Sequence, residues 1–199
     1  NKLCMNVAIL FGRKSSKSIK NKNIIKILSK PIFTYPIIAA KKVKAISKIY
    51  VSTDSNNIIE KSLKMGCEII KRPSYLCTDE ALLEDAIQHA VNYCQKINDY
   101  KIKNFIILLC NSICINYRDL SKGLNILQKN KRKDTVTTVS KFNNFSPVRA
   151  KKVKNKMLQN YIPNKQLSRF TKLSCDRDKS VHSFFCTQSF TISKAKILK

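Results

Sequence analysis

The stretch MNVAILFGRKSSKSIKNKNI, Met5 to Ile24, decides the fold, because an apolar run passes directly into a basic loop. Met5–Phe11 is a short, mostly apolar run rich in strand formers, which predicts a central parallel strand buried on both faces. Gly12–Asn23 is rich in lysine and asparagine and contains no acidic residue. Basic loops at the carboxyl ends of such strands bind phosphate-bearing ligands in α/β folds. We therefore expect this loop to bind phosphate; a solvated basic loop is the alternative.

Downstream of the loop, apolar strand patterns alternate with helical ones. Strands are predicted at Lys48–Ser52, Glu68–Ile70, Asn104–Leu109 and Thr135–Ser140, and helices at Tyr35–Lys44, Ser55–Gly66, Asp79–Ile97 and Tyr117–Gln128. This alternation predicts an α/β fold with a mostly parallel sheet and helices on both faces. The alternation stops beyond Lys141. Residues 141–177 look irregular and basic, and Ser183–Ser193 predicts one late strand.

The composition is that of one globular domain with a strong positive charge. The chain has 199 residues, 43% of them hydrophobic, and a formal net charge of +27 from 39 Lys and Arg against 12 Asp and Glu. An anionic partner is one explanation. Another is codon bias, since lysine, asparagine and isoleucine share A/T-rich codons. Neither aromatics interleaved with basic residues nor paired RNA-binding motifs are visible, so we expect no nucleic-acid partner.

The eight cysteines favour a reduced, cytoplasmic protein. None forms a C-x-x-C pair and no histidine lies near Cys110 or Cys114, so a zinc site is not expected. No apolar run approaches the length of a membrane span, and the short N-terminal run lacks a cleavage site, so we expect neither a membrane segment nor a signal peptide. The chain begins with Asn1 and stops at Lys199 just after a strand pattern, from which we expect a fragment truncated at the C-terminus.

Several ordered blocks carry a family resemblance. They are GRKSSKSIKNKN (Gly12–Asn23), KPIFTYPIIAA (Lys30–Ala40), IYVSTDS (Ile49–Ser55), RPSYLCTDEALLEDA (Arg72–Ala86), FIILLCNS (Phe105–Ser112), TVTTVSKFNNFSPVRA (Thr135–Ala150) and CDRD (Cys175–Asp178). In order and spacing they resemble the CMP-acylneuraminate synthetases, cytidylyltransferases that activate nine-carbon acidic sugars. The blocks cover most of the chain, and VSTDS followed by RP-x-x-L-x-T is the most specific part.

The resemblance implies a single Rossmann-like nucleotidyltransferase domain over residues 1–199. It also implies a reaction in which the anomeric hydroxyl of a 2-keto sugar acid attacks the α-phosphate of CTP and pyrophosphate leaves. Such chemistry depends on in-line positioning and on cancelling triphosphate charge. Mg²⁺ is the implied cofactor and a homodimer the implied assembly. Residues 141–177 would then form an insertion for the dimer contact or the sugar side.

The resemblance also implies roles for particular residues. Arg13, Lys17 and Lys22 fall on the basic loop positions that hold the triphosphate and assist catalysis. Asn23 and Arg72 fall on positions that contact the cytosine. For Arg72 the alternative is a surface arginine before a proline.

Two further positions are implied for the sugar, Asn111 and Arg149. Asn111 follows a buried strand, where a polar strand terminus is the alternative, and Arg149 would meet the sugar carboxylate. Asp54 is expected to be a structural turn or helix cap.

The chain also departs from the family pattern. The family's loop is rich in glycine, and this loop has lysine and serine instead, which makes close backbone approach to phosphate harder. Leu82 and Leu83 stand where relatives have small or hydroxyl residues near the cytosine. The family's metal-binding aspartates lie in a later segment, and we do not assign Asp176 or Asp178 as ligands. The alternatives are therefore a non-catalytic relative with the same fold and, from another class, an RNA-associated protein.

Overall fold

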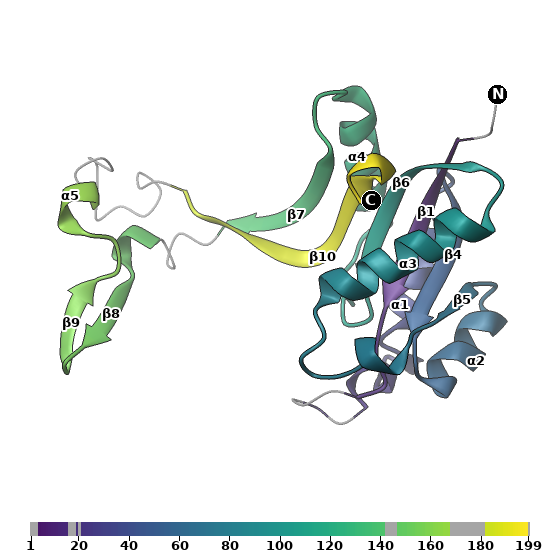
Figure 1. Ribbon diagram of the computed structural model, residues 1–199, viewed down its shortest axis with the longest axis horizontal. Coiled ribbons are helices and arrows are strands. Elements are labelled where there is room, and N and C mark those ends of the chain that lie inside the picture. The colour runs from purple at the N-terminus through teal and green to yellow at the C-terminus, as the bar shows by residue number, and fades with distance from the viewer. Residues whose placement is uncertain (1–3, 16–18, 20, 142–146, 168–181, 199) are drawn as a thin grey trace. The chain divides into compact units, whose positions relative to one another are not determined.

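The computed structural model describes residues 4–15, 19, 21–141, 147–167 and 182–198 (Figure 1). It divides the chain into two compact units. The first contains Asn1–Thr138 and Gln188–Lys199, and the second contains Val139–Thr187. The second unit includes the segment 141–177, whose predicted part in dimer contact or sugar binding stays a prediction.

A six-stranded sheet is the centre of the fold, in the order β5-β4-β1-β6-β10-β7. Its strands are β1 (Cys4–Phe11), β4 (Ile46–Thr53), β5 (Glu68–Lys71), β6 (Lys101–Leu109), β7 (Thr135–Lys141) and β10 (Phe184–Lys194). β1 pairs in parallel with β4 and β6, and β4 pairs in parallel with β5. β10 runs antiparallel to β6. The predicted mostly parallel sheet is confirmed, with one antiparallel strand inserted next to β6.

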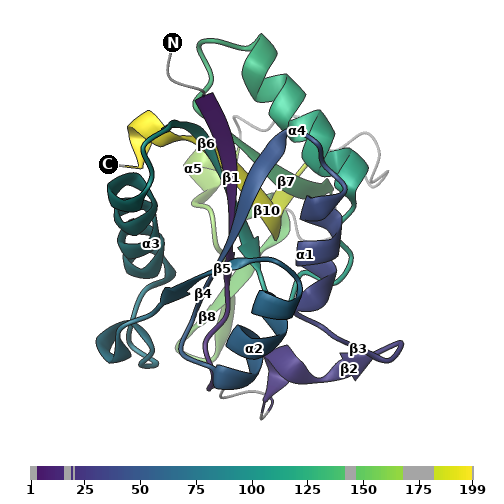
Figure 2. The ribbon, with the colours of Figure 1, turned by 90° about the vertical axis from the view of Figure 1, so that its right-hand side faces the viewer.

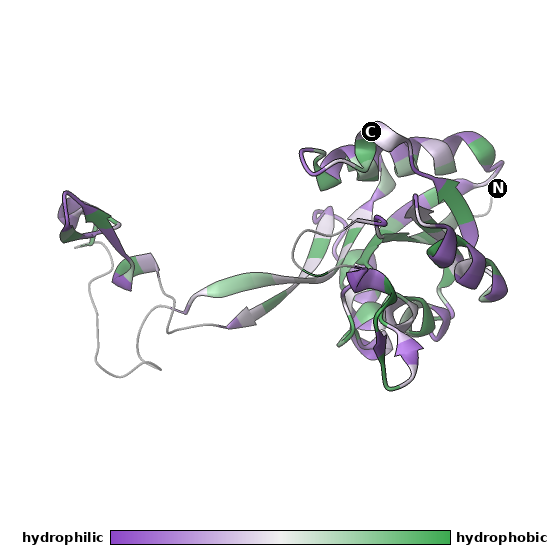
Figure 3. Cartoon of the chain, turned by 90° about the horizontal axis from the view of Figure 1, so that it is seen from below, coloured by the Kyte–Doolittle hydropathy of each residue, from purple (hydrophilic) through white to green (hydrophobic). Residues whose placement is uncertain are grey.

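Helices cover both faces of this sheet (Figure 2). The helices α1 (Thr34–Lys41), α2 (Asn56–Lys64) and α4 (Tyr117–Lys129) lie on one face, and α3 (Leu83–Ile97) lies on the other with the 3₁₀ helix Ala195–Ile197. Successive side chains of β1 enter opposite cores: Ala8 and Leu10 pack under α1, and Val7, Ile9 and Phe11 pack under α3. This explains why the buried part of β1, Val7–Phe11, reads as a continuous apolar run. Helices α2, α3 and α4 combine buried apolar residues with exposed polar ones, and the cartoon shows both kinds of residue along the helices (Figure 3).

Smaller elements were harder to predict. After the basic loop come a 3₁₀ helix (Lys22–Ile24) and a hairpin of β2 (Lys26–Ile27) and β3 (Lys30–Pro31). The second unit contains the 3₁₀ helix Pro147–Arg149, an antiparallel hairpin of β8 (Lys151–Lys154) and β9 (Met157–Asn160), and α5 (Asn164–Leu167). The sequence analysis treated this hairpin as irregular. Its turn residues Asn155 and Lys156 have φ of 52° and 61°, the two positive values of a tight hairpin turn, and lysine is a weak signal for that conformation.

Helix ends differ by a few residues from the predicted ones. Helix α2 ends at Lys64, and Gly66 lies just beyond its C-terminus as expected, with a φ of 67° that suits a residue without a side chain. Helix α3 begins at Leu83 rather than at Asp79. Within the described ranges, no helix is long and apolar enough to cross a membrane.

We predict that Leu108→Ala lowers the free energy of unfolding by about 2–5 kcal/mol, because Leu108 is fully buried in β6 and its truncation leaves a cavity. The matched control is Leu63→Ala on α2, where the leucine is 55% exposed. We expect the control to cost less than about 0.5 kcal/mol. Urea unfolding followed by circular dichroism measures both. Equal losses in the two variants would contradict the assignment of the core.

Candidate functional site

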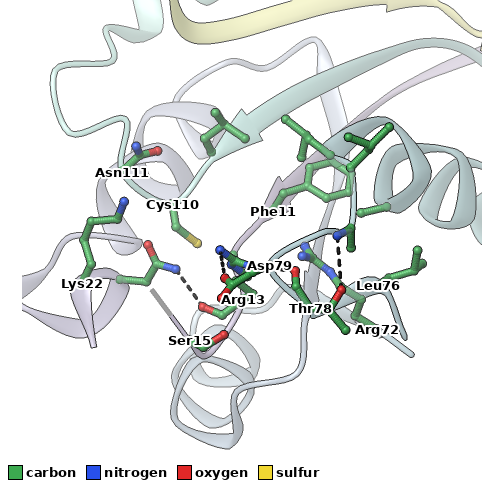
Figure 4. A pocket seen from close by; sticks show the side chains of 17 residues that line it. Phe11, Arg13, Ser15, Lys22, Arg72, Leu76, Thr78, Asp79, Cys110 and Asn111 are labelled. Atoms are coloured by element: carbon green, nitrogen blue, oxygen red, sulfur yellow. Dashed lines mark hydrogen bonds and ion pairs between the residues drawn. The ribbon is translucent and has the colours of Figure 1, made fainter. Parts of the chain in front are cut away.

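A cavity of about 230 Å³ lies at the carboxyl ends of β1 and β6 (Figure 4). Its walls come from the first loop, from the segment between β5 and α3, and from the end of β6. Five residues that the sequence analysis singled out line it together: Arg13, Lys22, Asn23, Arg72 and Asn111. They come from three separate parts of the chain, which meet because parallel strands end at the same edge of a sheet.

The first loop is tied to its neighbours by hydrogen bonds. The backbone N–H of Gly12 donates to the Ser52 carbonyl at 3.2 Å, and that of Lys14 donates to Asp54 Oδ1 at 2.6 Å. Asn23 Nδ2 donates to the carbonyl of Arg13 at 2.9 Å, so the far end of the loop bonds back to its start. Asp54 therefore makes a structural contact, but to the first loop and not as the expected turn or helix cap.

At Gly12 the backbone of the first loop passes very close to the side chain of Cys110. A Cβ atom added there would lie 2.1 Å from the Sγ of Cys110, which follows β6. Because real Cβ atoms do not approach other atoms so closely, only glycine fits while Cys110 keeps its position. Burial raises the pKa of the Cys110 thiol to about 12, which keeps this thiol neutral and suits a packing role.

The guanidinium of Arg13 is held by the segment that precedes α3. Its Nη1 donates to the Thr78 carbonyl at 2.5 Å, and its Nη2 lies 2.8 Å from Asp79 Oδ1.

The prediction that the helix begins at Asp79 is wrong, because the residues before Leu83 form a turn. The Thr78 hydroxyl accepts from the backbone N–H of Ala81, and this local turn competes with the helix. The sequence analysis quoted this segment within a family block but assigned no role to Thr78 or Asp79.

Arg72 is 7% exposed, so the alternative of a surface arginine is wrong. Its Nε donates to Ser52 Oγ at 3.2 Å and its Nη2 to the Ser52 carbonyl at 2.8 Å. The guanidinium also lies 5.7 Å from the centre of the Phe11 ring. Burial lowers the pKa of Arg72, since desolvation disfavours the charged form. The bonds to Ser52 compensate for that burial and fix Arg72 at the cavity wall.

Lys22 reaches the cavity from the far end of the first loop, and Asn111 from the residues just after β6. Lys22 is half-buried in the 3₁₀ helix that closes the loop, and Asn111 is exposed just after β6. Asn23 uses one N–H on the loop, which leaves its second N–H and its carbonyl oxygen for a ligand. Leu82 and Leu83 also line the cavity, with exposures of 61% and 38%, and make part of its wall apolar.

The described structure does not test the roles of the remaining assigned residues. Lys17 lies outside the described residues, as do Asp176 and Asp178. Arg149 is exposed in the second unit, in the 3₁₀ helix Pro147–Arg149. The predicted roles of Lys17 and Arg149 therefore stay predictions.

The described residues do not fit a magnesium site built by the protein. Mg²⁺ is held by one or two carboxylates together with substrate phosphates. The cavity wall, as far as the structure describes it, offers the carboxylate of Asp79, and Arg13 lies against it. No group of three or more His, Cys, Asp or Glu side chains that could hold a metal occurs in the described ranges.

Two kinds of sequence comparison agree on what this chain is similar to. A family model described as cytidylyltransferase matches residues 7–173. A Helicobacter pylori protein named pseudaminic acid cytidylyltransferase and UDP-2,4-diacetamido-2,4,6-trideoxy-beta-L-altropyranose hydrolase is 31% identical over 75% of this chain and 28% of its own length. An N-acylneuraminate cytidylyltransferase of Escherichia coli is 28% identical over 71% of this chain and 33% of its own length. This chain matches a third or less of these two relatives.

The fold has solved neighbours. A CMP:2-keto-3-deoxy-manno-octonic acid synthetase complexed with CTP superposes with a TM-score of 0.67, over 98% of this chain and 76% of that one. The sequence identity is 16%, so this likeness concerns the fold.

We predict that Gly12→Ala destabilises the protein by about 1–3 kcal/mol, because the added methyl group overpacks against Cys110. The companion Gly12→Ala/Cys110→Ala removes the sulfur but leaves the Cβ of residue 110 at 3.1 Å. We therefore expect the double variant to lose less stability than the two single variants lose in sum. Urea unfolding of the four proteins completes the double-mutant cycle. Strict additivity would show that the two residues do not clash.

Proposed function

The chain belongs to the cytidylyltransferase family, and from this premise we propose that its cavity binds CTP and that the protein transfers CMP to a nonulosonic, sialic-acid-like sugar acid. The expected resemblance to CMP-acylneuraminate synthetases is confirmed. The observation that carries the proposal is the convergence of Arg13, Lys22, Asn23, Arg72 and Asn111 on one cavity. The cavity also lies at the edge of the sheet where such folds bind nucleotides.

Two positively charged side chains support the proposed binding of the triphosphate. Arg13 and Lys22 belong to the first loop and line the cavity, and both side chains are only partly buried. A guanidinium offers paired N–H donors to phosphate oxygens, and an ammonium offers a compact positive charge. In the proposed complex these two residues bind the β- and γ-phosphates and stabilise the charge that grows on pyrophosphate as it leaves. Lys17 is a third candidate from the same loop.

Polar and apolar groups in the cavity wall support the proposed binding of the cytosine nucleoside. Asn23 has a carbonyl oxygen and an N–H to offer to the edge of a cytosine. Arg72 is held rigid by Ser52 and reaches the same cavity. Leu82 and Leu83 supply apolar surface against which a base can pack. A fixed donor set beside an apolar wall is typical of small-molecule sites.

In the proposed reaction the anomeric hydroxyl oxygen of the sugar acid attacks the α-phosphorus of CTP in line with the leaving group. The new bond joins that oxygen to phosphorus, the bond to the β-phosphate oxygen breaks, and the hydroxyl proton passes to solvent. The protein contributes positioning and charge stabilisation, which such transfers chiefly require. The Mg²⁺ requirement that the family resemblance implies stays a prediction. So does the cytoplasmic location.

Two residues, Asn111 and Arg149, are proposed to bind the acceptor, the sugar acid. Asn111 lines the cavity at the end of β6 and offers an amide to the sugar's hydroxyl groups. Arg149 is proposed to pair with the sugar carboxylate, as the family resemblance implies. Relatives differ in the sugar acid in their names, pseudaminic acid in one and N-acylneuraminate in another. We therefore propose the class of sugar acid and not one member.

We predict that Arg13→Ala and Lys22→Ala each weaken CTP binding by about 10- to 100-fold, because each loses a charge-assisted contact to phosphate. Lys129→Ala is the matched control, since Lys129 is an exposed lysine at the end of α4, away from the cavity lining. We expect the control to bind CTP like the parent. Isothermal titration calorimetry with CTP, in the presence and absence of Mg²⁺, measures all four proteins.

A folded parent chain that binds no CTP would contradict the proposal and would favour the non-catalytic relative. RNA binding that falls steeply with added salt, without competition by CTP, would favour the RNA-associated alternative. CTP binding without turnover on any nonulosonic acid would limit the proposal to nucleotide binding.

We also propose that the protein is a homodimer that uses the second unit. That unit exposes apolar side chains on the hairpin β8–β9 and just after it: Val153 (71%), Met157 (66%), Leu158 (74%) and Tyr161 (63%). Monomeric proteins rarely expose clustered apolar side chains of this size, and a second copy would remove them from water. The expected insertion over residues 141–177 contains all four.

We predict that Leu158→Asp shifts the protein from dimer to monomer, because burying an unpaired carboxylate at the contact is unfavourable. Leu63→Asp places the same change on an exposed leucine of α2 in the first unit and should leave the dimer intact. Sedimentation velocity over a range of protein concentrations measures both. A parent chain that is monomeric at all concentrations would overturn the dimer.

A further inference from the structure

Asp79 introduces a negative charge into a cavity that is otherwise suited to anions. Among the described residues that line this cavity, Asp79 is the single carboxylate, and Arg13, Lys22 and Arg72 are the cations. The Asp79 carboxylate lies 2.8 Å from Arg13, and the two side chains are 31% and 30% exposed (Figure 4). Partly exposed ion pairs are weak enough to open. Arg13 therefore has a partner in the cavity that a phosphate group can replace.

The contact is not needed to orient Arg13. The Thr78 carbonyl already accepts from Nη1 of Arg13, and that carbonyl is fixed by the turn in which the Thr78 hydroxyl accepts from Ala81. What Asp79 adds is mainly its charge, which offsets the charge of Arg13 and repels anions that approach it. Each additional phosphate group on a ligand increases this repulsion, but it also increases the attraction to Arg13 and Lys22.

We infer that Asp79 is a specificity-determining residue that competes with the polyphosphate of the ligand for Arg13. The inference rests on the proposed function, since it requires the triphosphate to bind at Arg13. The Arg13–Asp79 pair opens when CTP enters and forms again when pyrophosphate leaves. Asp79 thus weakens the binding of CTP and of pyrophosphate alike and assists release of the product. A monophosphate such as CMP, which places less charge near Arg13, is affected less.

The test compares Asp79→Asn with the parent by calorimetric titration with CTP, pyrophosphate and CMP. Asparagine keeps the shape and an acceptor oxygen for Arg13 but removes the charge. We expect CTP and pyrophosphate to bind about 3- to 10-fold more tightly to the variant, and CMP to change less. The gain should shrink as NaCl is raised, because salt screens charges at partly exposed sites.

Asp134→Asn is the matched control, since it removes the same charge at the other end of the sheet. Asp134 pairs with Lys194 at 3.2 Å and with Lys196 at 2.9 Å, and β10 residue Lys194 is paired with the beginning of β6. We expect this control to bind CTP like the parent. Asp79→Ser serves as a second charge-removing variant if thermal unfolding shows that Asp79→Asn does not fold.

The outcomes separate this inference from the proposed function. Unchanged or weaker CTP binding by the folded charge-removing variant, beside a parent that binds CTP, would overturn the role of Asp79 alone and leave a positioning role. An equal gain for CMP and CTP would also overturn it. Failure of every variant and of the parent to bind CTP would overturn the proposed function and this inference together.

Discussion

The parallel pairing of β1 with both β4 and β6 is the constraint on which the rest of the structure depends. Its register sets Phe11 opposite Ser52 on one side and opposite Leu109 on the other. Three strands therefore end level, and the loops that follow them must share one edge of the sheet. The backbone of Gly12 then passes so close to Cys110 that no side chain fits between them. The basic loop is brought to the cavity by this pairing and not by its own sequence.

Buried polar contacts beneath the cavity turn this edge into a rigid support. Arg72 lies under the loop with its guanidinium bonded to Ser52, and Ser52 also accepts from Gly12 through its carbonyl. A buried guanidinium is costly unless its donors are satisfied, so these bonds hold the ends of β1, β4 and β5 together. Groups held in this way lose little further entropy when a ligand binds.

The net charge of the whole chain does not determine the charge of the cavity. Lysines are distributed over the entire sequence, and the net charge of +27 says little about where an anion binds. In the cavity, by contrast, Arg13 is paired with Asp79 while Lys22 lies near the loop's far end. Local balance of this kind governs which anions are held and released, because nearby charges act more strongly than distant, screened ones.

The sequence alone determined the strand and helix alternation, the apolar cores and the first loop as a phosphate-binding candidate, because these depend on local periodicity and residue type. It also sufficed to single out Arg13, Lys22, Asn23, Arg72 and Asn111, through ordered blocks that resemble a known family. Only the tertiary structure decided that Arg72 is buried, that β10 enters antiparallel to β6, and that residues 79–82 stay outside α3 so that Asp79 faces Arg13. These features depend on contacts between segments far apart in the chain, and such contacts leave no periodic signal in the residues that make them.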